Sequence, residues 1–449
     1  MREAVHNDGR VYEDRRSSDM PPAPFSLRVY ETRMSGTLSR CRRRFRLRTR
    51  ANTASLAAWE CGPVGACGES RADGANLERA CPGSNAWAPV GNASGARMFV
   101  NGIGTANPPR SYSKAECWEA FAASDWFLRL DRRAHIIAEA VLTKDNGIAS
   151  RALAVDALRE VFQIDPDTLH GRFLANAPAL AAAAGTSALR DAELTTRDID
   201  GLVISTCTGY LCPGLTSYVI ERMGLRSDVL AFDLVGQGCA AALPNWRLAD
   251  ALLAADGCRH VLSICVEVSS AAMYLDNDPG VLISACLFGD GAGAAVLSRQ
   301  ANPQRRAIEW KSFASLIDPT ERSALQFETR NGMLRNILTR PVPRLAAEHA
   351  EQVLHRVLDA AGLTSADIAA WIMHAGGRDV LAALQHRLHL TVEDLRYSAD
   401  MLHRYGNMSS AFVYFVLEAA LKDNAKPGWW WMSAFGAGFS CHGALLKAA

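Results

Sequence analysis

The sequence predicts an α/β fold in which helices alternate with buried strands. Two observations carry this prediction. Short apolar runs recur from residue 98 to the C-terminus, and helix-forming stretches separate them. The runs are also nearly continuous in apolar character, which is typical of strands covered on both faces. We therefore expect mostly buried sheets flanked by helices.

The expected elements follow in chain order. Strands are predicted at Met98–Gly102, Gly201–Ser205, Val229–Val235, Val261–Val266, Gly293–Leu297, Ala369–Met373 and Trp429–Phe435. Helices are predicted over Asp165–Leu194, Ala241–Ala255, Leu345–Ala361 and Ser409–Leu421. The polar segment Arg299–Arg306, which contains Pro303, is a plausible bridge between two halves. We expect these halves over residues 98–300 and 301–449.

Residues 1–97 differ in composition from the rest of the chain. They contain 16 arginines, no lysine and 10 acidic residues, a formal local charge of +6. They show no sustained period of 2 or 3.6, so we expect a mostly disordered, Arg-rich N-terminal extension. A targeting or RNA-binding arm is one alternative. A mis-assigned start is the other, since Met98 stands just before the first predicted strand, and we prefer it.

Composition excludes several classes of partner. The formal net charge is +1, which gives no reason to expect a nucleic acid. No apolar run approaches the roughly 20 residues that span a bilayer, and no apolar leader begins the chain. The 12 cysteines are scattered without a Cys-x-x-Cys pair. We expect free thiols in a reducing, cytoplasmic compartment, and no metal site.

Cys239 is the first candidate for chemistry. It follows Gly236-Gln-Gly238 at the end of an apolar run, and helix-forming residues follow it. Glycines permit a sharp turn, and the amides of a following helix lower a thiol pKa. Pro244 suits a first helical turn, so the regular helix is expected to begin near Leu243. The competing interpretation is an inert buried cysteine.

His374 and Asn407 are the second and third candidates. His374 ends an apolar run and precedes Ala-Gly-Gly, whereas Asn407 precedes a helical stretch. Taken singly, a satisfied strand-end histidine and a helix N-cap are the better interpretations. Together, an imidazole N–H and an amide can stabilise the oxyanion or enolate of a thioester. The glycine-rich run Leu287-Phe-Gly-Asp-Gly-Ala-Gly-Ala lacks a following Lys-Ser/Thr, so we interpret it as a tight turn.

The combination of motifs resembles the type III polyketide synthases, the chalcone and stilbene synthase family. It rests on Gly-Gln-Gly-Cys239, Leu-Phe-Gly-Asp-Gly-Ala-Gly, His374-Ala-Gly-Gly, Tyr-Gly-Asn407-Met-Ser-Ser-Ala and Phe435-Gly-Ala-Gly-Phe. Their order and spacing match across about 98–449. The resemblance implies a thiolase-like fold of two similar α/β halves, with helices between buried mixed sheets. It also implies a homodimer with no bound cofactor.

The resemblance further implies a reaction on acyl-CoA and malonyl-CoA. Cys239 would take an acyl group from a CoA thioester. His374 would keep Cys239 as a thiolate and, with Asn407, hold the malonyl thioester carbonyl during decarboxylation. The enolate would then attack the acyl thioester, and the extended chain would cyclise.

Departures from the plant members concern the pocket. The plant gatekeeper Phe is aligned here with Met273, and a second falls near Leu334–Arg335. Thr-rich plant sequence at the pocket wall becomes Cys207-Thr208. Replacement of aromatic gates by a flexible Met suggests room for an elongated acyl chain. The expected products are therefore those of bacterial-type members with fatty acyl starters: alkylpyrones, alkylresorcinols or phloroglucinols.

Two residues are candidates for gripping the CoA phosphates, and two other functions stay open. Lys144 and Arg151 could bind CoA, although surface solvation is the alternative. A ketoacyl-carrier-protein synthase III would perform a single condensation on the same scaffold, but such enzymes usually show His-Gln-Ala-Asn and Gly-Asn-Thr-Ser motifs. A non-catalytic scaffold member is disfavoured because the cysteine, histidine and asparagine are all present.

Overall fold

The computed structural model describes residues 90–91, 97–255 and 257–449. The expected disorder of residues 1–97 therefore lies almost wholly outside the described residues.

Ten strands of the described chain form one sheet, and nine of them run in the order β12-β13-β14-β9-β2-β8-β7-β5-β6. The tenth, β1 (Val90–Gly91), pairs with β9. The bounds of the nine are β2 (Met98–Ala106), β5 (Gly201–Ser205), β6 (Leu230–Leu234), β7 (His260–Glu267), β8 (Gly291–Ser298), β9 (Ile308–Ile317), β12 (Ile368–Met373), β13 (Gly428–Gly436) and β14 (Ser440–Ala448).

The sheet contains two sets of four strands with the same pattern, and β6 extends the first set beyond β5. In the first, β2 and β8 are antiparallel, β8 and β7 are antiparallel, and β7 and β5 are parallel. In the second, β9, β14, β13 and β12 repeat this order and these directions. A short antiparallel pairing of β2 with β9 joins the halves. The pattern agrees with the expected thiolase-like fold, whereas the boundary residues stay a prediction.

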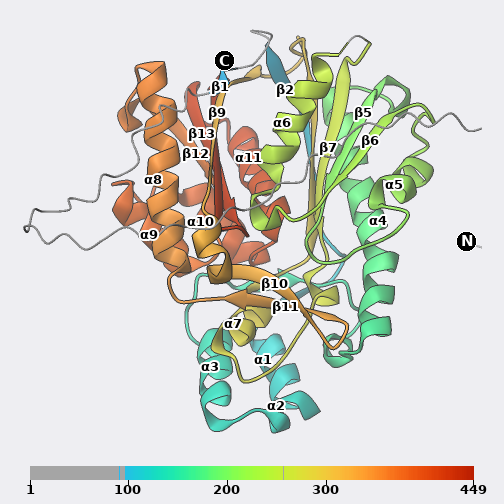
Figure 1. Cartoon of the computed structure of the whole chain (residues 1–449), viewed down its shortest axis with the longest axis vertical. Helices are drawn as coiled ribbons and strands as arrows, with labels where there is room; N and C mark the ends of the chain where they lie inside the picture. The colour runs from blue at the N-terminus through green and yellow to red at the C-terminus, as the bar shows by residue number, and fades with distance from the viewer. Residues whose placement is uncertain (1–89, 92–96, 256) are drawn as a thin grey trace, which may run out of the picture. The chain divides into compact units, whose positions relative to one another are not determined.

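Helices cover and separate the two halves (Figure 1). The long α4 (Pro166–Ala192) packs on β2 and β8, and α8 (Val342–Ala361) packs on β9 and β14. Between the halves lie α6 (Ala242–Leu253) and α11 (Phe412–Lys422), each of which contacts strands of both. These two central helices are therefore the most enclosed elements of the fold.

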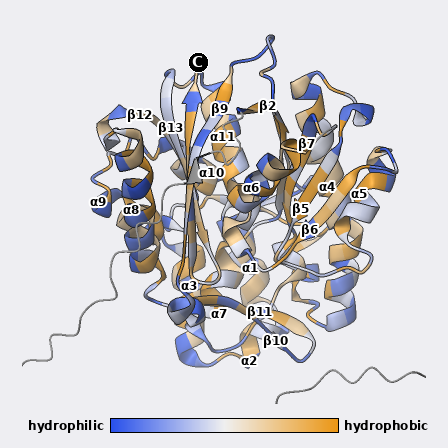
Figure 2. Cartoon of the chain, turned by 45° about the horizontal axis from the view of Figure 1, so that its top comes forward, coloured by the Kyte–Doolittle hydropathy of each residue, from blue (hydrophilic) through white to orange (hydrophobic). Residues whose placement is uncertain are grey.

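Packing of the outer layer depends on small residues, and packing of the core on large ones. A Cβ added at Gly104 would lie 2.3 Å from the carbonyl oxygen of Ala184, so β2 and α4 approach closely because glycine faces an Ala-rich helix. In the core, Trp246, Trp310 and Trp430 are fully buried. Figure 2 shows apolar residues concentrated inside and polar residues on the outer faces of helices such as α8. Apolar burial is the main stabilising contribution.

Further elements gather at one end of the molecule (Figure 1). Between β2 and α4 the chain inserts β3 (Ser111–Ser113), α1 (Lys114–Ala122), α2 (Asp125–Arg129), α3 (Arg132–Thr143), β4 (Ser150–Ala152) and the 3-10 turn η1 (Leu158–Phe162). Here α1 to α3 and η1 are named the cap. Between β7 and β8 it inserts α7 (Pro279–Leu287), and between β9 and α8 the hairpin of β10 (Leu325–Arg330) and β11 (Met333–Leu338). The cap contacts α7, and α7 contacts β11.

All seven predicted strands and the four predicted helices are confirmed, with shifts at their ends. Helix α6 begins at Ala242, so Pro244 lies in its first turn as expected. The chain also forms α5 (Leu215–Met223), α9 (Arg378–Arg387) and α10 (Arg396–Tyr405), which the sequence analysis did not predict. Among the described helices, none is long and apolar enough to cross a membrane.

Candidate active site

Cys239 lies in a tight turn between β6 and the central helix α6. Gly236 has φ +82° and Gly238 has φ +54°, values that favour glycine. The turn continues as η3 (Gly238–Ala240), so Cys239 lies at the N-terminal approach to α6. Its side chain is 8% exposed. The glycine pair therefore places the thiol where the sequence predicted it.

Gly436, at the end of β13, allows the sheet of the second half to reach this turn. A Cβ there would lie 2.6 Å from the carbonyl oxygen of Gln237 and 2.7 Å from the amide nitrogen of Ala240. Real Cβ atoms do not approach backbone so closely, so only glycine fits without displacing the cysteine turn. Gly436 of the Phe435-Gly-Ala-Gly motif thus leaves room for the turn that carries Cys239.

Asn407 and Ser409 come from the loop that precedes the other central helix, α11. The amide nitrogen of Ser409 donates to Asn407 Oδ1 at 2.8 Å, and Asn407 Nδ2 donates to the carbonyl oxygen of Gly376 at 2.9 Å. Ser409 itself has φ +50°, a left-handed conformation that is costly for a side-chain-bearing residue. In this conformation its hydroxyl donates to Cys239 Sγ at 3.2 Å.

These contacts link Cys239 and Asn407 across the two halves and end close in sequence to His374. The chain of hydrogen bonds runs from Cys239 through Ser409 and Asn407 to Gly376, two residues after His374. His374 is 1% exposed and lies edge-on to Phe412, with ring centroids 5.3 Å apart. Neither ring nitrogen of His374 has a hydrogen-bond partner among the described residues. A buried imidazole with two open nitrogens is uncommon and marks a site that expects a ligand.

Burial opposes ionisation of both the thiol and the imidazole. It raises the pKa of Cys239 to about 12, against a smaller lowering effect of the Ser409 hydroxyl. It lowers the pKa of His374 to about 3. Each group is thus neutral on its own near pH 7 in this ligand-free arrangement. A thiolate forms here only if a neighbouring base takes the proton and its charge stabilises the sulfur.

A buried carboxyl, Glu267, lies beside the thiols. It is fully buried at the end of β7, and burial raises its pKa against hydrogen bonds from Ser410, Cys207 and Thr208. Thr208 Oγ1 donates to it at 3.0 Å, and the Cys207 amide at 3.1 Å. Cys207 Sγ also lies 3.3 Å from Ser409 Oγ. One hydroxyl, that of Ser409, therefore contacts both Cys207 and Cys239.

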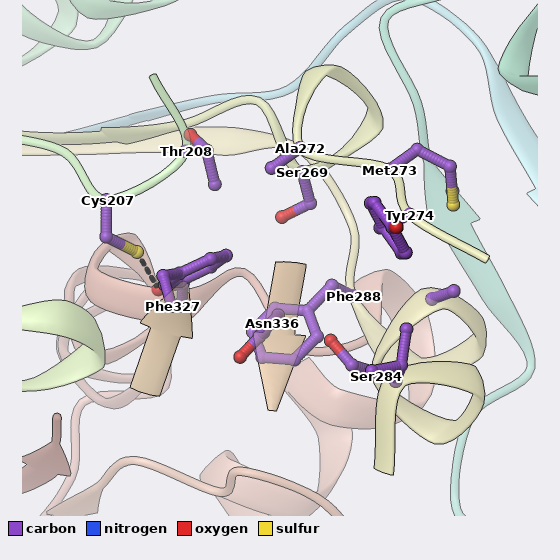
Figure 3. Close-up of a pocket in the computed structure, with 13 residues that line it drawn as sticks. Cys207, Thr208, Ser269, Ala272, Met273, Tyr274, Ser284, Phe288, Phe327 and Asn336 are labelled. Atoms are coloured by element: carbon purple, nitrogen blue, oxygen red, sulfur yellow. Dashed lines mark hydrogen bonds between the residues drawn. The ribbon is translucent and has the colours of Figure 1, made fainter. Parts of the chain in front are cut away.

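A pocket opens beside this network (Figure 3). Three of the predicted substrate residues, Cys207, Thr208 and Met273, line it, whereas Leu334 does not. Asn336, two residues beyond Leu334 on β11, lines it instead. The complete lining is Cys207, Thr208, Ser269, Ala272, Met273, Tyr274, Val281, Ser284, Ala285, Phe288, Phe327, Asn336 and Ser409.

The pocket wall contains aromatic residues at positions other than the two gatekeeper positions considered in the sequence. Phe288, Phe327 and Tyr274 all line the cavity, and Figure 3 shows their side chains among the lining residues. Phe288 belongs to the Leu-Phe-Gly-Asp-Gly turn that the sequence analysis had interpreted as structural only. The cavity therefore offers ring faces for a flat product as well as the flexible Met273.

The two predicted CoA ligands lie in different environments. Lys144 is exposed just after α3. Arg151 is only 6% exposed, and its Nη1 donates to the carbonyl oxygens of Ala285 and Phe288 at 2.8 and 3.0 Å. These carbonyls belong to the end of α7, so Arg151 caps that helix. Its assignment as a phosphate ligand is therefore withdrawn.

The sequence analysis missed Ser409, Glu267, Phe288 and Gly436. Ser409 and Phe288 each lie inside a motif already singled out, one or two residues from the residue considered. Glu267 had no sequence signal beyond its position at a strand end. No group of three or more His, Cys, Asp or Glu side chains that could hold a metal ion occurs among the residues the structure describes.

Comparison with known protein families gives two adjoining matches. Residues 140–314 match the family described as FAE1/type III polyketide synthase-like protein, and residues 312–449 match the C-terminal domain of chalcone and stilbene synthases. Together they cover Cys239, His374 and Asn407.

Similar proteins include two curated bacterial enzymes. The chain is 30% identical over 345 residues to the 3,5-dihydroxyphenylacetyl-CoA synthase of Streptomyces toyocaensis, covering 74% of this chain and 85% of that one. It is 33% identical over 360 residues to the 1,3,6,8-tetrahydroxynaphthalene synthase of Streptomyces peucetius subsp. caesius, covering 78% and 92%.

Solved structures with the same fold include two eukaryotic proteins at 24% identity. PKS-I from the brown alga Ectocarpus siliculosus superposes with a TM-score of 0.73, covering 79% of this chain and 99% of that one. The C-terminal type III polyketide synthase domain of Steely1 from Dictyostelium superposes with a TM-score of 0.71, covering 78% and 99%. At this identity the two structures support the fold alone.

Proposed function

This chain belongs to the type III polyketide synthases, acyltransferases that condense acyl-CoA with malonyl-CoA, and from that premise we propose how its residues share the reaction. The family acts on CoA thioesters and needs no further cofactor. The open questions are which side chains carry each step, which starter is used and what is made.

In the first step we assign the nucleophile to Cys239 and the base to His374. Cys239 Sγ attacks the thioester carbonyl of an acyl-CoA, the bond to the CoA sulfur breaks, and the acyl group becomes attached to Cys239. His374 takes the thiol proton and returns it to the departing CoA sulfur. Both ring nitrogens of His374 are open, and the opposite charges of the resulting imidazolium and thiolate offset the burial that lowers the pKa of His374. The Ser409 hydroxyl supports the developing sulfur charge through its hydrogen bond.

In the second step His374 and Asn407 hold the malonyl thioester. Loss of CO₂ leaves an electron pair on the α-carbon as an enolate, whose oxygen carries the charge. His374 N–H and the second N–H of Asn407 Nδ2 donate to that oxygen, since only one Nδ2–H is used by Gly376. The enolate carbon then attacks the Cys239 thioester, which lengthens the acyl chain by two carbons and frees the thiol. The extended chain now resides on CoA.

Two observations carry this assignment: both nitrogens of the buried His374 ring lack a hydrogen-bond partner, and the hydrogen bonds that join Cys239, Ser409 and Asn407 end at Gly376, two residues along the chain. A structural histidine in this core would be hydrogen-bonded. The alternative of a single-condensation synthase acting on a carrier protein finds no support among the relatives reported above, whose printed names are those of polyketide-type synthases.

Intact-protein mass spectrometry after incubation with acyl-CoA tests the first step. Wild type is expected to gain one acyl group, which peptide mapping places on Cys239. Cys239→Ala should gain none, whereas Cys212→Ala, which removes an exposed thiol, should gain one. Acylation at another residue, or none with any starter, would contradict the proposal.

The product is proposed to be a cyclised, polyhydroxylated ring or pyrone. The names of the two bacterial relatives denote polyhydroxylated aromatic compounds. The cavity combines ring faces of Phe288 and Phe327 with polar groups of Ser269, Ser284 and Asn336, a lining suited to a flat ring with hydroxyl groups. Alkylpyrone, alkylresorcinol and phloroglucinol products all fit this description of the lining. A product profile over short, long and aromatic starters distinguishes them.

We also propose that Lys144 contacts CoA. It is exposed at the C-terminal end of α3, in the cap. Lys144→Ala should raise KM for acyl-CoA without altering the product, and Lys114→Ala, which removes a nearby lysine, serves as the comparison.

We propose that the chain forms a homodimer through an edge strand of its sheet. β6 is the last strand of the described sheet, and Leu230, Phe232 and Val235 in or beside it are 43%, 40% and 62% exposed. Figure 2 shows this strand as mostly apolar. A flat apolar edge strand is a site for pairing with a second chain. Sedimentation should give a dimer that Phe232→Glu dissociates and that Val392→Glu, at a distant exposed apolar position, leaves intact.

Two further expectations are retained as proposals. The eight described cysteines are free thiols, which supports a cytoplasmic, reducing compartment. We also propose that residues 98–300 and 301–449 form the two halves and that residues 1–97 are dispensable. A chain that begins at Met98 is expected to fold and to keep its activity.

A further inference from the structure

Asn336 is a polar residue in a row of apolar side chains. It lies on β11, directly opposite Phe327 of β10, and both residues line the active-site pocket (Figure 3). Because side chains alternate along a strand, Leu334 and Leu338 share the Asn336 face of the hairpin. This alternation favours a third apolar residue at position 336. An asparagine there instead brings hydrogen-bonding groups into the pocket.

The Asn336 amide oxygen has no partner in the part of the chain that the structure describes. The residue is 8% exposed, and its Oδ1 accepts no hydrogen bond from a described residue. The Ser269 hydroxyl oxygen, in the 3-10 turn η4 (Ser269–Ala271), lines the same pocket and is likewise buried without a partner. Buried polar groups of native proteins are nearly always hydrogen-bonded. Two such groups in one pocket therefore point to a polar ligand.

The polyketide chain has the matching chemistry. Each extension places a keto group two carbons from the previous one, so the growing chain contains 1,3-diketone units. Held in its open form, without an internal hydrogen bond, an enolised 1,3-diketone presents one O–H donor and one carbonyl acceptor. Asn336 Oδ1 can accept from the enol O–H, and the Ser269 hydroxyl can donate to the carbonyl oxygen. An alkyl starter has neither group and gives these residues nothing to bind.

We propose that Asn336 and Ser269 bind an enolised 1,3-diketone unit of the growing polyketide and thereby favour ring closure through carbon over ring closure through oxygen. The inference rests on the proposed function, because decarboxylative extension supplies the diketone. It adds two specificity-determining residues to the reaction, from segments that carry none of the assigned catalytic groups. It also narrows the product class that the proposed function leaves open.

The two modes of closure differ in the atom that attacks. In closure through oxygen, the enol oxygen bonds to the thioester carbonyl, the C–S bond breaks, the thiol leaves with the enol proton, and a pyrone results. A hydrogen bond from the enol O–H to Asn336 holds that oxygen away from the thioester. The enol carbon stays free to attack a carbonyl and form a carbocycle. The enol proton then leaves with the thiol in a Claisen closure or goes to the new alkoxide in an aldol closure.

Calorimetry with an unreactive ligand tests the binding step. The probe is a CoA thioether whose chain ends in a 1,3-diketone, and its control has methylenes in place of both keto groups. The affinity of the diketone relative to the control should fall about fivefold in Asn336→Leu, the effect of one neutral hydrogen bond. The ultraviolet absorbance of the enol should increase when the diketone binds wild type. An unchanged affinity ratio, or an unchanged enol fraction, would overturn the inference.

The product ratio tests the consequence for ring closure. Wild type is expected to form carbocyclic products, and their ratio to pyrones should fall about fivefold in Asn336→Leu and in Ser269→Ala. Ser269→Thr keeps a hydroxyl and should stay near the wild-type ratio. Thr329→Val removes a polar group from the same face of the hairpin but outside the pocket lining, so it should leave the ratio unchanged. A wild-type enzyme that forms pyrones alone would contradict the inference.

The double variant Asn336→Leu/Ser269→Ala shows whether both residues hold the same unit. If they do, its product ratio should fall little below that of either single variant, whereas effects that multiply would overturn the pairing. Acylation of Cys239 is measured on every variant. Normal acylation with an unchanged product ratio overturns this inference alone. Failure of every starter to acylate wild-type Cys239 overturns the proposed function.

Discussion

The catalytic loops and the cavity wall of this enzyme are built in different ways. Each catalytic loop has a counterpart in the other half: η3 with Cys239 precedes α6, and η7 (Ser409–Ala411) precedes α11 just after Asn407. His374 follows β12 as Thr206 follows its counterpart β5. The wall instead comes from insertions that differ between the halves, namely the cap and α7 in the first half and the β10–β11 hairpin in the second.

The two regions are also held by different forces. The catalytic loops are fixed by backbone turns and close glycine contacts, as at Gly238 and Gly436. The wall is fixed by ion pairs of Arg335 on β11, whose guanidinium contacts Asp276 at 2.8 Å and Glu328 at 2.9 Å. Chemistry is thus set by a repeated, rigid scaffold, whereas the pocket can vary without moving the reacting groups.

The largest effect is expected from His374→Gln, which tests whether the loop residues act as one unit. Burial raises the pKa of Cys239 to about 12. Without a base, the thiolate fraction therefore increases about tenfold for each unit by which the pH is raised, as long as the pH stays below that pKa. The variant should lose about 10²–10⁴-fold in kcat. Alkylation of Cys239 by iodoacetamide should be slower than in wild type at pH 7 and should increase log-linearly up to pH 10. Equal alkylation rates at pH 7 would show that His374 is not the base.

Much of the scaffold was predictable because buried strands leave a strong apolar pattern. β9 and β14 were not, since polar side chains such as Lys311 and His442 interrupt their runs. Cys239, His374 and Asn407 could be selected because glycine turns and motif order are local features. Glu267 and Ser409 act through contacts between distant segments, which no local pattern shows.

The errors have physical reasons of the same kind. Arg151 looked like a surface charge, but a guanidinium can be buried when the carbonyls and negative dipole end of a helix receive it, as the end of α7 does here. The aromatic wall was missed because Phe288 was interpreted only as part of a turn and Phe327 lies on a hairpin whose position depends on the fold. Pocket composition is decided by which insertions meet in space, and the sequence alone does not reveal this.

A smaller effect is expected from Arg335→Met, which tests the plasticity of the wall. The change leaves the carboxylates of Asp276, Asp278 and Glu328 without their common partner. It should lower the free energy of unfolding by about 2 kcal/mol and alter the distribution of products. Acylation of Cys239 should stay within about threefold of wild type.

Two controls make the Arg335 result specific. Arg335→Lys keeps the charge but not the planar fork, so it should restore stability only in part. Arg344→Met removes an exposed ion pair with Glu348 and should change neither property. If Arg335→Met lost stability as expected but kept the wild-type product distribution, the ion pairs of Arg335 would not be what shapes the pocket.

The smallest effect at neutral pH concerns the scaffold itself, because it is confined to acid. His442 on β14 is 3% exposed, its Nδ1 lies 2.7 Å from Ser315 Oγ, and its ring stacks on Phe313. Burial lowers its pKa to about 4 from an ordinary value of 6.5. The unfolded chain therefore binds a proton more readily than the folded one, so stability from this group is complete above pH 6.5 and falls as pH decreases toward 4.

Urea unfolding between pH 7 and 4.5 measures this contribution. His442→Gln should reduce the loss of stability across that range by about 2–3 kcal/mol, while the product distribution stays that of wild type. Arg247 and Asp250 line the cavity beside His442 and are present in both proteins. His386→Gln, at an exposed histidine on α9, should leave the pH dependence unchanged. Arg335→Met is expected to alter the products, and His442→Gln is not. If His442→Gln also altered them, the pocket would respond to packing in the central sheet. The distinction between a rigid scaffold and a variable wall would then not hold.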